Sequence, residues 1–436
     1  MLAASGLAQE RQQLLARLAD ARRQTDEVFR LLRQEFLYDR PIAERHRIVF
    51  YIGHLEAFDW NLMRERVLSV KTFNPEFDRL FAFGIDPVGG GLPTDQPADW
   101  PSIKDVRDYM MQVREALDTG LARMATDETA SLLLQVAIEH RLMHAETLAY
   151  MLHQLDPSNK IEIRASLELV ANPMRPRMLQ IPAGVATLGL SGGADEFGWD
   201  NEYEAHEVSV PGFEIDQFMV TNGDYLKFVN AGGYENRVFW DEEGWKWKTE
   251  QNISKPVFWN RVKGEWRYRT MFSRIPMPAN WPVYVSHVEA SAYARWAGKA
   301  LPSEAQWHRA AYGTAESIER KYPWGDEAPD AKRGNFDFQR WDPTPVGAFP
   351  QGSSAFGAAD MLGNGWEWTS TVFASFEGFE PFPFYPGYST NFFDGKHYVI
   401  KGGSGRTAAC MLRRSFRNWF QAHYQYVYAG FRCVSN

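Results

Sequence analysis

Through about the first 170 residues, leucine and valine recur every three or four positions with polar residues between them. This period is that of an α-helix with one apolar face. The pattern predicts four helices, over residues 8–34, 44–70, 103–124 and 128–155. Four such helices form a bundle, whose interior can hold a metal or ligand site built from several helices.

The stretch between the second and third predicted helices, residues 72–101, has a different character. It contains Gly89-Gly90-Gly91 and several prolines, so we predict no helix there. A loop of this length in a compact domain is often functional, commonly at a ligand site.

Beyond Pro173 the pattern changes to short apolar runs broken by Gly, Pro, Asn and Asp, which indicates a second domain with few helices. The strongest helix there spans residues 288–298, and Ser303 is a candidate N-cap for the helix that follows. We therefore predict an α+β protein with a helical bundle over residues 1–170 and a second domain over residues 171–436.

Composition limits the classes of protein. A chain of 436 residues with 44% hydrophobic content can build two or three cores, and a net charge of -8 disfavours nucleic acid as a partner. The N-terminus lacks a signal-peptide core and no apolar run could cross a bilayer, so we expect a cytoplasmic protein with no membrane partner. The two cysteines, Cys410 and Cys433, are too few for a disulfide framework and are expected to be thiols.

Three histidines of the predicted bundle form a candidate metal site. His140 and His144 lie four residues apart on one helix, so both imidazoles can reach one ion. His54 lies in an apolar segment, where an unpaired imidazole is costly. Three neutral nitrogen donors suit a divalent transition metal and leave positions open for catalysis. The alternative is a polar seam on the helix surface. Glu56 and Glu146 are either orienting partners of the imidazoles or solvated helix residues.

Five segments of the second domain resemble successive blocks of the formylglycine-generating-enzyme-like domain, a variant of the C-type lectin fold. They are FEIDQFMVTN at 213–222, WAGKALPSEAQW at 296–307, YPWGD at 322–326, MLGNGWEWT at 361–369 and GFRC at 430–433. Together with a DinB-like four-helix bundle that carries a histidine and then the pattern His-x-x-x-His-x-Glu, they make the chain similar to the ergothioneine sulfoxide synthase family.

The resemblance implies a non-haem Fe(II) enzyme that uses dioxygen to join a chalcogen to hercynine, the trimethylated betaine of histidine. His54, His140 and His144 match the iron ligands of the family. Arg417-Asn418-Trp419 match the segment that holds the betaine end of hercynine. An aromatic face such as Trp419 suits a quaternary ammonium, which has no hydrogen to donate; ordinary core packing is the alternative.

The family also carries an active-site tyrosine, which delivers a proton to reduced oxygen. Tyr385 and Tyr388 lie near its position, and the sequence does not choose between them. Two residues depart from the family pattern beside the expected site. Met143 replaces a common Gln next to the second histidine of the pair, and Phe420 stands where an Asp commonly follows Asn-Trp.

A further departure lies after the second helix. Family members that use cysteine or its glutamyl peptide carry a Tyr-Tyr or arginine-rich stretch there, whereas this chain reads DRLFAFGIDPVGGG at 78–91. A donor with a free carboxylate favours a guanidinium partner, and no arginine lies between residues 85 and 101.

Phe83 and Asp86 are the residues of this segment that we assign to the chalcogen donor. Asp86, with Asp95 and Asp99, suits a neutral donor rich in hydroxyl groups, because carboxylates accept hydrogen bonds from sugar hydroxyls. We therefore predict a selenosugar donor and the selenoneine synthase branch of the family.

Three alternatives remain. An ergothioneine-type synthase that uses a thiol would need Arg79 or Arg107 to supply the missing carboxylate partner. A formylglycine-generating oxidase would need a close cysteine pair, whereas Cys410 and Cys433 are far apart in sequence. A non-enzymatic binding module would hold no metal, and metal content would distinguish it from an enzyme.

Overall fold

The computed structural model describes residues 2–84, 92–123, 127–161, 177–193 and 196–435. The chain divides into two compact units, unit 1 (residues 1–163) and unit 2 (residues 164–436). Each unit is described by itself. No helix within the described ranges combines the length and the apolar character needed to span a bilayer.

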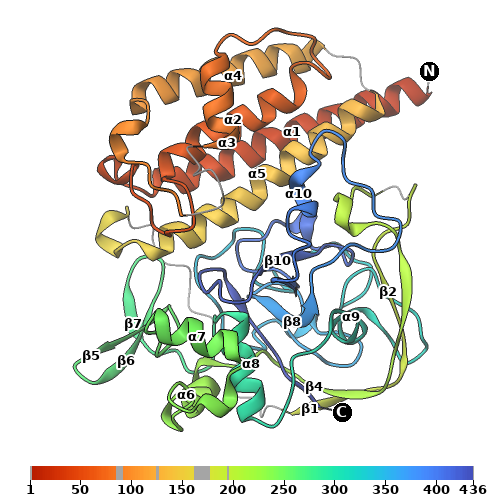
Figure 1. The fold of residues 1–436 in the computed structure, drawn as a ribbon. Coiled ribbons are helices and arrows are strands. Elements are labelled where there is room, and N and C mark those ends of the chain that lie inside the picture. Colours follow the sequence, from red (N-terminus) through yellow and green to blue (C-terminus); the bar gives the residue numbers. More distant parts are fainter. Residues whose placement is uncertain (1, 85–91, 124–126, 162–176, 194–195, 436) are drawn as a thin grey trace. The chain divides into compact units, whose positions relative to one another are not determined.

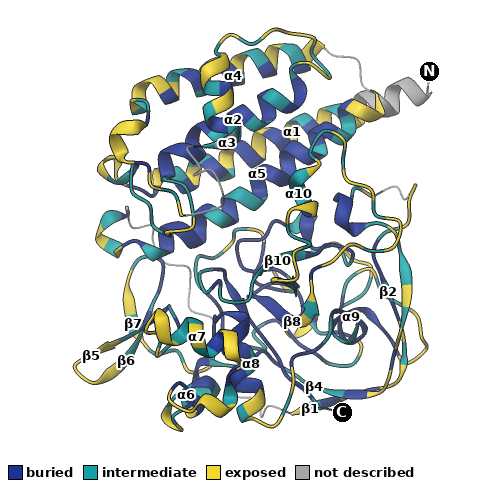
Figure 2. Cartoon of the chain, in the orientation of Figure 1, coloured by how far each residue is buried: buried dark blue, intermediate teal, exposed yellow. Residues whose placement is uncertain are grey.

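Unit 1 contains the four predicted helices, drawn in Figure 1 as α1, α2, α4 and α5. Their bounds are Leu2–Arg30, Ile48–Met63, Ile103–Arg123 and Glu128–Gln154. Helix α1 packs along α5, and α2 packs against both α4 and α5. Nearly all of α2 is buried (Figure 2), which explains why its sequence is apolar on all sides. This position places side chains of α2 in the interior of the bundle.

A short helix, α3 (Pro75–Phe83), lies in the stretch predicted to have no helix. The prediction was wrong because it gave the glycines at 89–91 too much weight and overlooked a local start signal. Asn74 accepts a hydrogen bond from the backbone N–H of Phe77 at 3.1 Å, and Pro75 occupies the first turn, where its missing N–H has no cost. Gly84 ends the helix with φ of 73°, a conformation that glycine adopts easily.

The described residues of unit 2 form four small sheets whose strands are mostly antiparallel. The order of one sheet is β10-β9-β8-β11 and of another β1-β4-β12; β2 pairs with β3, and β5, β6 and β7 form the fourth sheet. The strands of the first two sheets are Trp366–Val372 (β8), His397–Lys401 (β9), Asn418–Gln421 (β10), Ala429–Gly430 (β11), Met178–Ile181 (β1), Phe213–Asp216 (β4) and Val434–Ser435 (β12). The others are Gly184–Leu188 (β2), His206–Val210 (β3), Trp259–Val262 (β5), Glu265–Arg269 (β6) and Arg274–Pro276 (β7).

The helices of unit 2 are short. They are Asn222–Asn230 (α6), Glu242–Glu250 (α7), His287–Trp296 (α8), Glu304–Tyr312 (α9) and Gly387–Thr390 (α10). The predicted helix at 288–298 is thus confirmed as α8. Ser303 caps α9 by accepting a hydrogen bond from the N–H of Gln306 at 3.1 Å, as predicted.

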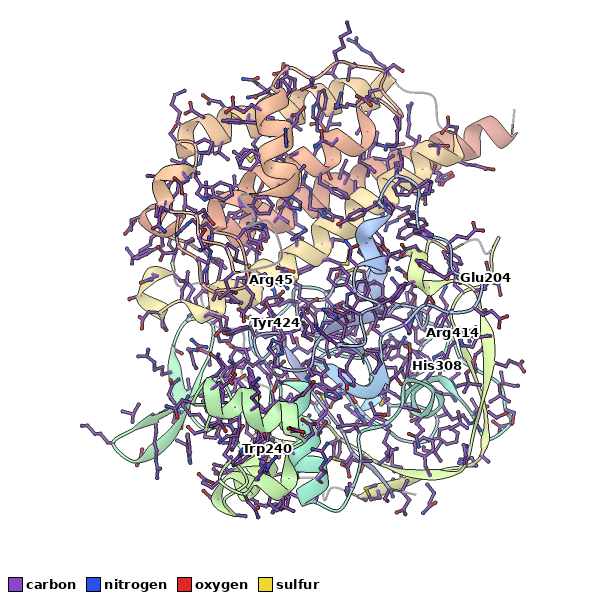
Figure 3. All side chains as sticks on the ribbon, viewed as in Figure 1. Arg45, Glu204, Trp240, His308, Arg414 and Tyr424 are labelled. Atoms are coloured by element: carbon purple, nitrogen blue, oxygen red, sulfur yellow. The ribbon has the colours of Figure 1, made fainter. Side chains whose placement is uncertain are left out.

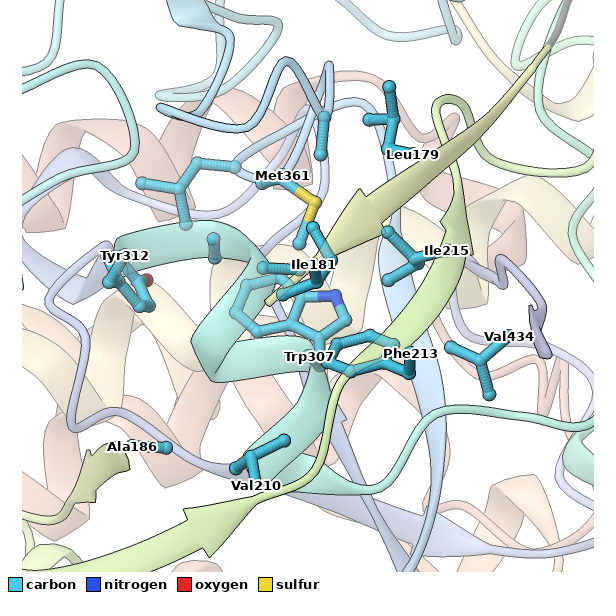
Figure 4. Close-up of a cluster of buried hydrophobic side chains, with 14 of the residues drawn as sticks. Leu179, Ile181, Ala186, Val210, Phe213, Ile215, Trp307, Tyr312, Met361 and Val434 are labelled. Carbon is cyan, nitrogen blue, oxygen red and sulfur yellow. The ribbon is translucent and has the colours of Figure 1, made fainter. Parts of the chain in front are cut away.

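A hydrophobic cluster holds β1, β4 and α9 together in unit 2 (Figure 4). Trp307 of α9 is fully buried among Ile181, Phe213 and Met361. The indole N–H of Trp307 donates to the buried carboxylate of Glu367 at 3.0 Å, so its one polar atom is satisfied. Two of the predicted family blocks, at 213–222 and 296–307, therefore contribute to one core.

Candidate functional site

The three predicted metal ligands converge inside unit 1. One ring nitrogen from each of His54, His140 and His144 can be chosen so that all three lie within 4.8 Å of one another. Their ring centroids are 4.5 to 5.3 Å apart. Helix α2 supplies the first histidine and α5 supplies the other two, one turn apart. This is the spacing that three ligands of a single ion require.

A backbone carbonyl sets the orientation of His54. Its Nδ1 atom lies 2.7 Å from the carbonyl oxygen of Phe81 on α3, so Nδ1–H donates and Nε2 keeps its lone pair. Metal-bound histidines usually have such a partner for the second nitrogen. Helix α3 thus orients His54, a candidate metal ligand, through its backbone.

Aromatic residues of α2 hold two of the imidazoles. The ring of Phe58 stacks on His140 at 3.5 Å between centroids, and Phe50 stacks on His54 at 4.7 Å. No hydrogen-bond partner from the described parts of the chain reaches the buried Nδ1 atom of His144. A buried nitrogen of this kind is costly unless something binds to the imidazole.

All three imidazoles are neutral at physiological pH. Burial lowers the pKa of His54 to about 4, although the hydrogen bond to Phe81 opposes the shift. Burial and the other histidines lower the pKa values of His140 and His144 well below the usual range. Neutral imidazole is the form that binds a metal, so the residues present fit a divalent transition-metal ion.

The segment assigned to the chalcogen donor is organised differently from the prediction. Asp86 lies outside the described residues, and so does the side chain of Phe83. Asp95 is buried. It accepts hydrogen bonds from Arg47 and Trp100, and it forms an ion pair with Arg40. These partners occupy its carboxylate, so Asp95 is not available for a hydroxyl-rich donor.

Asp99 is exposed and accepts a hydrogen bond from the backbone N–H of Gln96 at 2.7 Å, so one of its oxygens caps a short turn. Glu56 was expected to orient an imidazole or to face solvent. It is instead buried and bound to Arg114 and Arg141. The local sequence could not show the two partners of Glu56, because Arg114 and Arg141 lie far from it along the chain.

Trp419 of β10 lies in an aromatic group within unit 2. Its ring stacks on Phe373 at 4.0 Å, and Tyr388 and Phe392 approach at 5.4 and 5.6 Å between centroids. Tyr388 is nearly perpendicular to the indole, with an interplanar angle of 76°. We call Trp419, Phe373, Tyr388 and Phe392 the aromatic group. Rings in such arrangements can bind a cation.

The two candidate tyrosines pack on each other, with ring centroids 5.5 Å apart, but their other neighbours differ. Tyr388 lies on α10 between Trp419 and Trp199, on which it stacks at 4.1 Å. Tyr385 precedes the helix, and burial raises its pKa to about 12, with a further contribution from the charge of Asp200. Of the two, Tyr388 is the one that belongs to the aromatic group.

Other residues predicted around Trp419 have structural partners. Arg417 is buried and donates to both carboxylate oxygens of Glu304, at 3.0 and 3.1 Å, so its guanidinium anchors the start of β10. Asn418 accepts a hydrogen bond from the N–H of Trp419 at 2.8 Å. Phe420 stacks on Tyr424 at 5.1 Å, on the opposite side of the strand from Trp419.

Sequence reasoning named Met143 beside the three histidines but missed Phe58 and the carbonyl of Phe81. Phe58 follows His54 by one helical turn, so its position on the same face of α2 was readable from the spacing. Met143 lies next to His144 on α5, half-buried, as its position in the sequence required. The carbonyl of Phe81 had no signal in the sequence, because every residue carries one.

Two cavities lie away from these residues. One, of about 610 Å³, is lined by apolar residues after α2 and by the second half of α4, including Phe73 and Gly120. The other, of about 290 Å³ in unit 2, includes Arg414, which together with His308 binds Glu319 (Figure 3). Neither includes a metal histidine or a member of the aromatic group, so we assign no function to them.

Comparison with known families supports both units. The sulfatase-modifying factor enzyme 1-like domain matches residues 165–436, and the DinB superfamily matches residues 17–153. These matches confirm the predicted order of a DinB-like bundle and a formylglycine-generating-enzyme-like domain in an α+β chain.

Comparison with individual proteins covers most of the chain. The hercynine oxygenase of Mycobacterium tuberculosis is 37% identical, over 75% of this chain and 76% of that protein. The hercynine oxygenase of Mycolicibacterium smegmatis is 35% identical, over 82% of this chain and 83% of that protein. Ergothioneine biosynthesis protein 1 of Neurospora crassa is 27% identical, over 93% of this chain and 55% of that protein.

Proposed function

The chain belongs to the hercynine oxygenase family of oxidative enzymes, the ergothioneine-type sulfoxide synthases, and we propose that it joins a chalcogen to hercynine with Fe(II) and dioxygen. The observation that carries this proposal is the convergence of His54, His140 and His144. A bound Fe(II) ion would supply the dioxygen chemistry and favour the anionic form of the chalcogen donor. Three histidines leave positions on the metal for these partners.

The reaction balances without another reductant. A C–H bond between the two imidazole nitrogens of hercynine and the S–H or Se–H bond of the donor are replaced by one C–S or C–Se bond. The two hydrogens and one oxygen atom leave as water, and the other oxygen atom remains on the chalcogen. The two substrates together supply the four electrons that reduce dioxygen.

We assign recognition of the trimethylammonium group of hercynine to Trp419 and its aromatic group. A quaternary ammonium offers no hydrogen-bond donor, so ring faces are its suitable partners. Tyr388 is the better candidate for the proton donor, because its ring lies against Trp419, whereas the ring of Tyr385 lies against Tyr388 itself. Arg417 acts in this proposal as the anchor of β10 rather than as a substrate contact.

For the donor we propose a selenosugar. Arg79 and Arg107, the candidates for binding a donor carboxylate, are both exposed on the surface of unit 1. Arg40 and Arg47 approach the segment from elsewhere in the chain, but they bind Asp95. A donor without a carboxylate needs none of these guanidinium groups.

A thiol amino acid is the second candidate donor, and Arg45 is the observation that favours it. Its charge lies close enough to His144 to contribute to the lowered pKa of that imidazole. Arg45, labelled in Figure 3, also donates to the hydroxyl of the buried Tyr150 at 2.7 Å. A guanidinium held in this way could bind a donor carboxylate.

One assay separates the two donors. Protein loaded with Fe(II) is given hercynine and air, together with a selenosugar, cysteine or glutamylcysteine in separate reactions, and products are identified by mass spectrometry. A selenium adduct formed only from the selenosugar supports the first proposal. A sulfur adduct that disappears in Arg45→Leu supports the second, and absence of any adduct would contradict both.

A further inference from the structure

A buried ion-pair network lies directly beside the metal centre. Arg141 follows His140 on α5 and its side chain is 0% exposed. Its guanidinium donates to the carboxylates of Glu56 at 2.9 Å and Asp59 at 2.6 Å, both on α2. The same side chain thus connects the two helices that carry the metal ligands.

A third bond of Arg141 links the neighbours of two metal ligands. Its Nη2 atom donates to the backbone carbonyl of Leu55 at 2.9 Å. Leu55 follows His54, just as Arg141 follows His140. The contact therefore fixes the backbone of α2 against α5 at the level where the two imidazoles must meet.

The network extends to the other two helices of the bundle. Arg114 of α4 donates to Glu56 at 2.8 and 3.0 Å and to both oxygens of Asp26 on α1, at 2.7 and 2.8 Å. The four long helices α1, α2, α4 and α5 are therefore all connected through Glu56, directly or by way of Arg114.

Stability alone does not account for such a network. The free energy needed to transfer two charges from water into a protein interior is about as large as the attraction between them there. Apolar residues of similar volume therefore often stabilise a core at least as well. What charged groups add is a defined geometry, because the five N–H groups of an arginine fit only one arrangement of partners. That arrangement lies where a metal site needs precise spacing.

We propose that Arg141 is a positioning residue of the metal centre, which sets the spacing of His54 and His140 through its bonds to Leu55, Glu56 and Asp59. This inference rests on the metal assignment within the proposed function and not on the identity of the substrates. It predicts that metal affinity and coordination change when Arg141 is replaced, even where the bundle remains folded.

The test uses Co(II), whose visible absorption reports the coordination of the ion, added to the metal-free full chain. Arg141→Met leaves the buried carboxylate of Asp59 without its partner and that of Glu56 with Arg114 alone, so it is combined with Glu56→Gln and Asp59→Asn to remove the excess negative charge. We expect the triple variant to fold, as judged by circular dichroism, but to bind Co(II) at least about tenfold more weakly and with an altered spectrum. Arg141→Lys, which keeps the charge, should also weaken binding and covers the case in which the uncharged variant does not fold.

The matched control is Arg22→Met. Arg22 is another buried arginine of the bundle. Its ion-pair partner Asp118 is 62% exposed, and within the described residues Arg22 acts on Asp59 through its charge but makes no hydrogen bond to α2, so Arg22→Met controls for the loss of a buried positive charge. It should bind Co(II) as the unaltered protein does. If the folded triple variant and Arg141→Lys bind Co(II) with unaltered affinity and spectrum, Arg141 has no positioning role. Absence of Co(II) binding by the unaltered protein would instead refute the metal assignment.

Discussion

At the scale of single residues, the chemistry of the metal centre depends on which nitrogen of each imidazole is free. The Phe81 carbonyl holds the Nδ1–H of His54, so Nε2 is the nitrogen that could bind the proposed ion. Burial keeps the imidazoles unprotonated, so metal binding does not have to displace protons at neutral pH. Small groups around each ligand thus decide whether three histidines form a site.

Replacing one ligand tests the site directly. His140→Ala should lower iron content and turnover together, because two histidines hold a divalent ion much less tightly than three. Iron is measured by elemental analysis after dialysis and turnover by mass spectrometry. His206→Ala, in unit 2, is the control and should keep both. Full activity of His140→Ala would show that the ligand assignment is wrong.

The proposed contact between Trp419 and the quaternary ammonium can be tested by comparing ligands with and without that group. Trp419→Leu should weaken hercynine binding about tenfold, the effect of losing a desolvated cation–aromatic contact. Free histidine lacks the three N-methyl groups of hercynine and should bind more weakly. Its affinity should therefore fall less than that of hercynine when Trp419 is replaced. Calorimetric titration of both ligands measures the difference. Equal losses for the two would indicate that Trp419 has a packing role only.

The two tyrosines make a matched pair. Tyr388→Phe should lower the turnover number roughly 100-fold with little change in KM for hercynine, because a positioned proton donor acts in the transition state. Tyr385→Phe should have a much smaller effect, since that hydroxyl does not belong to the aromatic group. Steady-state kinetics of both variants decide the assignment, and the reverse ranking would transfer the role to Tyr385.

At the scale of elements, the short helix α3 is the part of unit 1 that most changes the picture. It packs on α2 at Gly53, where an added Cβ atom would lie 2.4 Å from the ring of Phe81. Only glycine permits this approach, which brings the Phe81 carbonyl to His54. The buried carboxylate of Asp78 fastens the helix by accepting from Tyr109 at 2.7 Å and Trp60 at 3.2 Å.

We therefore predict that Gly53→Ala reduces metal affinity. The methyl group should displace α3, lengthen the hydrogen bond to His54 and reduce metal affinity, with a loss of about 1–3 kcal/mol in unfolding free energy from overpacking. Gly120→Ala on α4 is the control, because its methyl group meets only the flexible end of Leu68. Metal titration and chemical denaturation test both variants, and equal metal affinities would exclude a role for α3.

At the scale of the whole molecule, stability should fall as the medium becomes acidic. Burial lowers the pKa of His287 in unit 2 to about 4, so between pH 6.5 and 4 the unfolded chain binds a proton that the folded chain does not. The stability contributed by this group is present above pH 6.5 and lost as pH falls through that window. The three metal histidines contribute with the same sign.

His287→Phe isolates one contribution. In the unaltered protein the rings of His287 and Tyr398 stack with centroids 3.8 Å apart. A phenyl ring can keep this stacking but cannot titrate. Between pH 4 and 6.5 the unfolding free energy of the variant should depend less steeply on pH, by up to about 1.4 kcal/mol per pH unit. Denaturant titrations at several pH values measure the slopes. Identical slopes would mean that the pKa of His287 is the same in the folded and the unfolded chain.

The sequence by itself determined what depends on neighbours along the chain. Helical periodicity placed His140 and His144 on one face of α5, and capping chemistry placed Ser303 at the start of α9. Five ordered motifs identified the second domain, and the family comparison confirmed it. These features are local, so a single sequence contains the information needed to predict them.

Tertiary structure decided what depends on residues distant in sequence. Only the packing of α2 against α5 brings His54 to the histidine pair, and only the fold shows that Arg40 and Arg47 occupy Asp95. The backbone carbonyl that orients His54 has no sequence signature, because a hydrogen bond of this kind depends on position and not on residue type. The proposal of Tyr388 rather than Tyr385 as proton donor likewise rests on ring contacts that only the fold shows.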